Sequence, residues 1–123
     1  MMVLFGVLLA GAAGAVVRYL VDGGVQRRFG AQVPIGTLVV NVAGSFILGL
    51  LTGAALYHQP DPAIRTVLGT GFCGALTTWS ALSWETVRLV EEGTPRVAVI
   101  AMVGGLTTSL VAGAAGIGLV GLL

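Results

Sequence analysis

Hydrophobic residues along this chain form four long stretches, at about 2–21, 33–57, 63–89 and 97–123, separated by short connections that contain polar residues, glycine or proline. A helix needs about 20 predominantly apolar residues to cross the hydrocarbon core of a bilayer. Each stretch reaches that length, so the pattern predicts four transmembrane helices that form a single membrane domain over residues 1–123. The expected fold class is therefore an all-α membrane protein.

Three of the four stretches carry small or polar residues at every fourth position. These rows are Gly6, Ala10, Gly14 and Arg18 in the first stretch, Thr37, Asn41 and Ser45 in the second, and Gly105, Ser109 and Gly113 in the fourth. Four-residue spacing places a row on one face of a helix, and small side chains let a second backbone approach that face closely. We therefore expect these faces to contact protein rather than lipid.

Three polar residues in these rows have two interpretations each. A carboxamide near mid-span, such as Asn41, is costly unless it is hydrogen-bonded, so it either links two helices or lines a pore as a donor. Ser109 either bonds the carbonyl four residues earlier in its own helix or faces the groove between helices. Arg18, near the end of its stretch, either extends to the membrane interface or is a buried charge that holds a loop or helix end.

The third stretch differs from the others because Gly69, Gly71 and Gly74 precede a run of threonines and serines. Glycine costs ~1 kcal/mol relative to alanine inside a helix, and hydroxyl groups offer the backbone other hydrogen-bond partners. The helix can therefore open between about Gly74 and Ser80, and carbonyls freed at bilayer depth are candidate cation ligands. The alternative is an intact helix whose small residues serve packing.

Glu85, further along the same stretch, is either a vestibule charge or an ordinary charge near a helix end.

The composition agrees with a membrane protein, because 56% of the residues are hydrophobic, 9% are charged and the mean hydropathy is +1.01. Soluble domains average roughly 25% charged residues. We interpret the first stretch as a span rather than a signal peptide, because no basic segment precedes it. One cysteine excludes an internal disulfide, and Cys73 with His58 is too little for a transition-metal cage. The six arginines form no basic patch for nucleic acid, and no catalytic constellation is visible.

The sequence resembles the Fluc (CrcB) family of fluoride channels in three blocks: GAAGAVVRY at Gly11–Tyr19, GTLVVNVAGSFILG at Gly36–Gly49 and GFCGALTTWSALSWE at Gly71–Glu85. The resemblance covers essentially the whole chain. It implies four-span subunits with a broken third helix, an antiparallel dual-topology-type dimer, and two pores that lower cytoplasmic fluoride by passive export. It further implies a structural sodium ion that is not transported, and a multi-pass location in the plasma membrane of a prokaryote.

By motif position, the resemblance assigns the sodium-coordinating main-chain carbonyls to Gly74 and Thr77. Fluoride is small and strongly hydrated, so its pathway must replace water with N–H, O–H and ring-edge donors. The residues expected along the anion pathway are Thr37, Asn41, Trp79, Ser80 and Ser109. Arg18 and Glu85 are expected in structural or vestibule roles.

Two departures from the family pattern occur in the third block. The family motif resembles TTFSTFS, and this chain has Trp79 and Leu82 where the motif has phenylalanines, and Ala81 where the motif has the threonine between them. Trp79 keeps a positive ring edge and adds an N–H donor, whereas Leu82 offers neither. The departures raise an alternative function, a non-conducting or half-pore subunit of a heterodimeric fluoride channel.

A second alternative is a small multidrug or guanidinium-type exporter coupled to protons. Such an exporter needs a titrating carboxylate at depth in its substrate site. Glu85 is the one acid that could serve, and its place near the end of a span fits poorly.

The arginines also predict an orientation. With four alternating spans, Arg27, Arg28, Arg88 and Arg96 lie on one side of the bilayer and Arg65 lies on the other, so the positive-inside rule places both termini outside in most copies. An antiparallel homodimer needs both orientations. We therefore rank the homodimer first and a homologous partner chain of opposite bias second.

Overall fold

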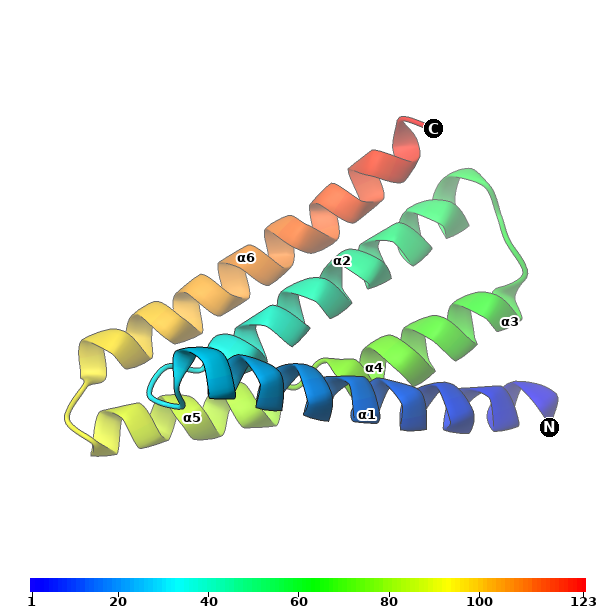
Figure 1. Cartoon of the computed structure of the whole chain (residues 1–123). Helices are drawn as coiled ribbons and strands as arrows, with labels where there is room; N and C mark the ends of the chain where they lie inside the picture. The colour runs from blue at the N-terminus through cyan, green and yellow to red at the C-terminus, as the bar shows by residue number, and fades with distance from the viewer.

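The computed structural model describes all 123 residues as helices joined by short connections, with no β-strand (Figure 1). The elements are α1 (Met2–Phe29), α2 (Ile35–Tyr57), α3 (Pro62–Arg65), the π-helix η1 (Thr66–Cys73), α4 (Gly74–Leu76), α5 (Trp79–Glu91) and α6 (Pro95–Gly121). Three of them, α1, α2 and α6, are long and apolar enough to cross a membrane. The predicted all-α membrane class is therefore confirmed.

The first helix is longer than the sequence pattern predicted. We expected a span over 2–21 followed by a connection, but α1 continues through Phe29 and ends at Gly30, whose φ of 82° lies in the left-handed region. Glycine adopts that conformation without steric cost, and Arg27 and Arg28 in the last turn complement the helix dipole. The prediction placed the end too early because Gly23 and Gly24 weaken a helix without ending it.

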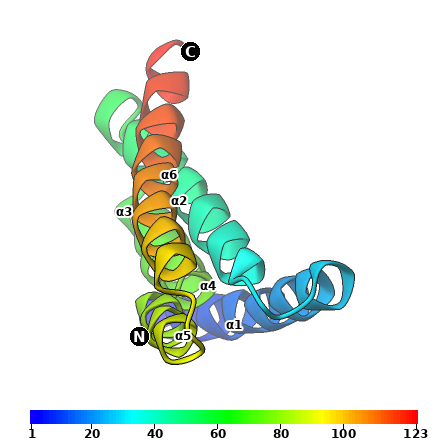
Figure 2. The same cartoon turned by 90° about the vertical axis from the view of Figure 1, so that its left-hand side faces the viewer.

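Two pairs of helical segments pack closely through small residues. Figure 2 shows α2 and α6 running side by side, and α1 likewise contacts η1. A Cβ added to Gly14 of α1 would clash with the carbonyl of Phe72, and one added to Gly49 of α2 would clash with the backbone of Gly113. Gly14 and Gly113, which belong to predicted four-residue rows, therefore lie where two backbones meet, whereas Gly6 and Gly105 of the same rows face side chains.

The third stretch is divided into several segments. Asp61 caps α3 by accepting a hydrogen bond from the amide of Ala63 at 2.8 Å, and η1 and α4 continue the helix to Leu76. Thr77 and Thr78 are then extended, with ψ of 154° and 117°, before α5 begins. The helix is thus interrupted inside the window from Gly74 to Ser80. Sequence patterns did not predict the π-helical turns of η1, a geometry that often occurs at functional sites.

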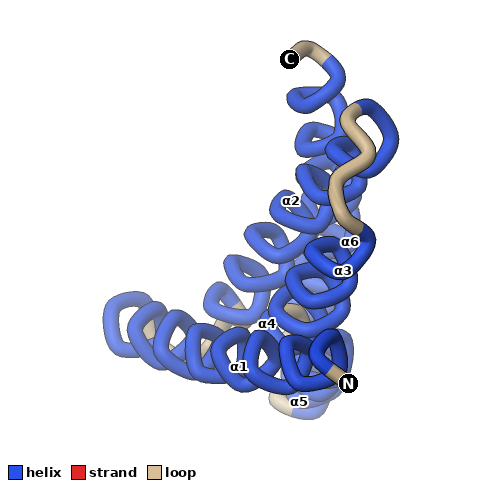
Figure 3. The backbone as a smooth tube through the Cα atoms, turned by 90° about the vertical axis from the view of Figure 1, so that its right-hand side faces the viewer, coloured by secondary structure: helices blue, strands red, loops and turns tan.

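The connections define two ends of the molecule. Both termini and the α2–α3 connection lie at one end of Figure 1, while the α1–α2 and α5–α6 connections lie at the other. Figure 3 shows α1 lying crosswise to the α2–α6 pair. A small apolar cluster of Leu89, Ala98 and Ala101 joins α5 to α6 near the second end.

Candidate functional site at the helix interruption

The interruption is held by a side chain from α2. Asn41 Oδ1 accepts a hydrogen bond from the amide of Thr78 at 2.7 Å, and Asn41 Nδ2 donates to the carbonyl of Thr78 at 3.0 Å. The carboxamide therefore pairs with both the backbone amide and the backbone carbonyl of Thr78, as the backbone of a neighbouring β-strand would. One turn further along α2, Gly44 leaves room for the side chain of Thr77. Asn41 thus acts as the interhelical link that was one of its two interpretations.

The same contacts divert two amides from their helical partners. In a continuous α-helix the amide of Thr78 would bond the carbonyl of Gly74, and the amide of Ala81 would bond the carbonyl of Thr77. Here the Thr78 amide donates to Asn41, and the Ala81 amide donates to Thr78 Oγ1 at 3.2 Å. The carbonyls of Gly74 and Thr77 therefore lose their usual donors. Main-chain oxygens of this kind are suitable ligands for a hard cation such as sodium.

A cavity of about 280 Å³ opens on one face of the interruption. It is bounded by α2, the third stretch and α6. The predicted site residues that line it are Asn41, Gly74, Thr77, Trp79 and Ser109. Main-chain carbonyls, a carboxamide, a hydroxyl and an indole therefore border one space, although these residues come from three parts of the sequence.

A second cavity, of about 550 Å³, opens between α1, α2 and α5. The predicted residues Arg18, Thr37 and Ser80 line this cavity rather than the first. Thr78 lines both cavities, and its hydroxyl lies 3.2 Å from that of Ser80. The residues expected along one anion pathway thus lie on two faces of the interruption, with Thr78 between them.

Thr78 is the residue that sequence reasoning left out of the site. The signal was present, because threonine is a preferred N-cap residue and Thr78 directly precedes α5.

The two departures from the phenylalanine pattern have different environments. Both side chains line the first cavity, but Trp79 is 62% exposed, whereas Leu82 is 2% exposed and packs near Gly105 of α6. Leu82 therefore fills space between α5 and α6. Of the two side chains, only Trp79 presents an aromatic ring.

Glu85 of α5 is hydrogen-bonded to Thr37, which belongs to the polar row of α2. Its Oε1 accepts a hydrogen bond from Thr37 Oγ1 at 3.1 Å, while its Oε2 is buried without a hydrogen-bond partner. Asp22 of α1, which the sequence analysis did not single out, also has a buried oxygen without a partner. Glu85 thus lies in the interior of α5, bonded to another helix, and is not a freely solvated charge at a helix end.

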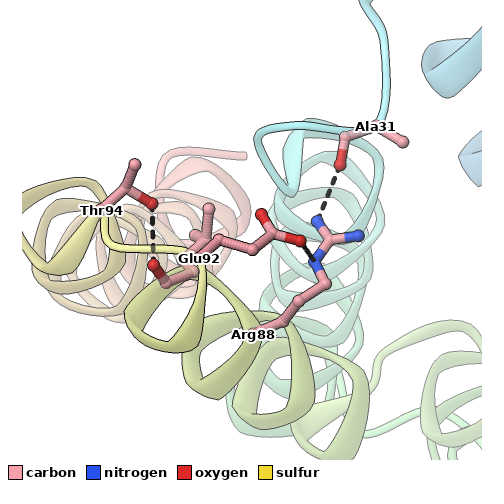
Figure 4. Close-up of polar contacts among 5 residues, drawn as sticks. Ala31, Arg88, Glu92 and Thr94 are labelled. Carbon is pink, nitrogen blue, oxygen red and sulfur yellow. Dashed lines mark hydrogen bonds and ion pairs between the residues drawn. The ribbon is translucent and has the colours of Figure 1, made fainter.

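The far end of α5 is fastened to the α1–α2 connection (Figure 4). Arg88 Nη2 donates to the carbonyl of Ala31 at 2.7 Å, and Arg88 Nε lies 3.8 Å from Glu92 Oε1. Thr94 Oγ1 donates to the carbonyl of Leu89 at 2.8 Å and closes the turn after α5. Polar contacts thus hold α5 at its beginning, middle and end.

Comparison with known proteins places these features in a family. Residues 5–117 match the family model described as "CrcB-like protein, Camphor Resistance (CrcB)". The chain is 45% identical over 118 residues to the fluoride-specific ion channel FluC 1 of Leifsonia xyli, with 96% of this chain and 85% of that protein covered. It is 43% identical over 119 residues to the fluoride-specific ion channel FluC 2 of Cutibacterium acnes, with 96% and 97% covered.

The similarity extends to an archaeal relative. Over 85 residues the chain is 49% identical to the fluoride-specific ion channel FluC of Methanocaldococcus jannaschii, with 69% of this chain and 67% of that protein covered. The family model and the bacterial relatives cover nearly the full length, including α1, the interruption and most of α6. This chain belongs to the Fluc (CrcB) family.

Proposed function

We propose that this chain is the subunit of a fluoride-selective channel that lowers cytoplasmic fluoride by passive export. The relatives named as fluoride-specific ion channels match it over most of their length. The structural observation that carries the proposal is the interruption at Thr77 and Thr78, where a carboxamide, hydroxyls and an indole surround diverted backbone groups. A channel for a strongly hydrated anion needs fixed donors of this kind.

The proposed topology has four spans, the third of which is the interrupted segment from α3 to α5. With both termini at one end, the chain crosses the bilayer an even number of times. Two copies of opposite orientation form the proposed dimer in the plasma membrane of a prokaryote. Interrupted backbone at bilayer depth is tolerated where protein or a wet cavity surrounds it, and the two cavities at Thr78 provide that environment.

The carbonyls of Gly74 and Thr77 are the proposed main-chain ligands of a structural sodium ion. They fit the ion because both carbonyls have lost their helical donors and both residues line the first cavity. A bound sodium ion would supply fixed positive potential beside the anion pathway. The chain's own contribution is to keep these two oxygens unpaired, which the contacts of Asn41 and Thr78 Oγ1 support.

A half-pore subunit paired with a homologous chain is the second candidate. Leu82 favours it, because this side chain is buried against α6 and presents no ring edge to an anion. The exporter alternative has no such support, because Glu85, the acid expected to serve it, is bonded to Thr37.

Fluoride efflux from liposomes that contain this polypeptide alone tests the proposal. We expect fluoride efflux well above that of protein-free liposomes, with no comparable chloride efflux. Ser109→Ala should reduce the flux because it removes a donor from the first cavity. Thr107→Val is the matched control, because the Thr107 hydroxyl bonds the carbonyl of Val103 in its own helix. Absent fluoride flux from the folded chain alone, with flux restored by a homologous partner, would favour the half-pore candidate instead.

A further inference from the structure

Of the two interpretations of Asn41, a link between helices and a pore donor, its hydrogen bonds support the link. A pore donor should leave its N–H groups available to the anion. In the structure, one Nδ2–H bonds the carbonyl of Thr78 and Oδ1 accepts from the amide of the same residue. Both polar atoms of the carboxamide thus bond the backbone of the interruption, while the second Nδ2–H is left for the first cavity.

The bond to the Thr78 amide matters most, because that amide has one alternative partner in the helix. If Asn41 Oδ1 were absent, the amide of Thr78 could bond the carbonyl of Gly74, as it would in a continuous α-helix. An unsatisfied amide at bilayer depth costs several kcal/mol, so this rearrangement would be favoured over leaving the amide unpaired. Such a rearrangement would remove the Gly74 carbonyl from the set of available cation ligands.

We infer that Asn41 is a positioning residue for the cation site, which it keeps open by holding the Thr78 peptide in an extended conformation. This inference rests on the proposed function, and specifically on the proposed sodium ligands. Asn41 need not touch the cation. It acts through Thr78, whose backbone leads from the proposed ligand Thr77 into α5. The position of α2, which carries the carboxamide, therefore determines whether the carbonyls of the third stretch remain free to bind a cation.

The test measures how the thermal midpoint of the detergent-solubilised protein depends on sodium. A ligand that binds the folded state raises this midpoint, by roughly 10 °C for a chain of this length when its concentration is about 100 times its Kd. We expect the wild-type chain to be more stable in sodium than in potassium at the same ionic strength. Asn41→Leu, which has a similar size but neither hydrogen-bonding group, should lose that difference.

Two further variants separate positioning from general damage. Asn41→Asp keeps an oxygen that can accept from the Thr78 amide, so it should retain the sodium-dependent difference even where fluoride flux falls. Thr52→Val is the matched control, because it removes from the same helix a hydroxyl that lies away from the interruption and makes no side-chain hydrogen bond. It should behave as the wild type. If Asn41→Leu does not fold, Asn41→Ser replaces it, because a serine hydroxyl is too short to span both groups of Thr78.

The outcomes distinguish this inference from the proposed function. Absence of wild-type fluoride flux contradicts the channel proposal, whatever the sodium response is. The inference is overturned if folded Asn41→Leu or Asn41→Ser responds to sodium as the wild type does, or if the wild type does not respond to sodium at all. Loss of the response in Asn41→Leu together with its retention in Asn41→Asp and Thr52→Val supports the inference.

Discussion

The two halves of the third stretch are held in the fold by different kinds of interaction. The half before the interruption packs its backbone against α1, with Gly14 and Gly71 at the contact, and no side-chain hydrogen bond joins it to that helix. The half after it, α5, is linked to other segments by Asn41, by Thr37 and by Arg88. Glycine contacts let two backbones pack directly against each other, whereas each hydrogen bond positions one particular group. The comparison suggests that the first half serves as a rigid support and that the second is positioned by individual polar residues.

Enlarging a glycine in the first half should have the largest effect. Gly14→Ala would place a Cβ against the carbonyl of Phe72, and backbone cannot move aside as a flexible side chain can. Overpacking typically costs about 1–3 kcal/mol, and a backbone clash lies at the upper end of that range. Gly24→Ala in the same helix meets nothing within 4 Å and should stabilise the helix by up to about 1 kcal/mol.

Thermal unfolding of both variants in detergent measures this contrast. The two substitutions are chemically identical and lie in one helix, so opposite shifts of the midpoint would isolate the effect of the close contact. A Gly14→Ala variant as stable as Gly24→Ala would show that α1 and η1 are not held by backbone packing.

The same contrast explains which features could be predicted from sequence. The small-residue rows predicted the close faces, because a missing side chain is visible in the sequence and its periodicity gives the direction. The glycine and hydroxyl run likewise indicated where a helix could open. The partner of each polar group was not visible, because Asn41 and Thr78 are 37 residues apart and their pairing depends on how α2 crosses the third stretch.

Other features were missed for local reasons. The end of α1 at Gly30 depends on one positive φ, and the four earlier glycines in 11–24 have no such effect. The π-helical geometry of η1 has no established composition signal in a single sequence. The division of the pathway residues between two cavities depends on the direction of α5 after Thr78, which two extended residues determine.

Removing a hydrogen bond from the second half should have an intermediate effect. Thr37→Val leaves Glu85 Oε1 without its donor, in a carboxylate whose other oxygen is already without a partner. Leaving a buried polar group unsatisfied costs about 1–3 kcal/mol. Thr86→Val is the control on α5, because the Thr86 hydroxyl bonds the carbonyl of Leu82 in its own helix at 2.7 Å. We expect a midpoint change of less than half that of Thr37→Val.

A double-mutant cycle sharpens this prediction. If the contact links α2 to α5, Thr37→Val and Glu85→Met, which removes the acceptor, should be non-additive, with a coupling of about 0.5–3 kcal/mol in the unfolding free energy. Additive effects would mean that Thr37 stabilises the protein through its own helix, and that α5 has one fewer polar attachment than the structure shows.

The smallest effects are expected at the far end of α5, where two contacts of Arg88 can be compared within one side chain (Figure 4). The bond to the Ala31 carbonyl is short, at 2.7 Å, and joins segments 57 residues apart. The ion pair with Glu92 spans 3.8 Å, and the Glu92 side chain is 56% exposed, so solvent screens the pair strongly.

Arg88→Met should therefore lower the unfolding free energy by about 0.5–1.5 kcal/mol, and Glu92→Gln by less than about 0.5 kcal/mol. Added salt should remove the small effect of Glu92→Gln and leave most of the effect of Arg88→Met. Equal losses from the two variants, both abolished by salt, would show that the ion pair rather than the bond to Ala31 holds this end of α5.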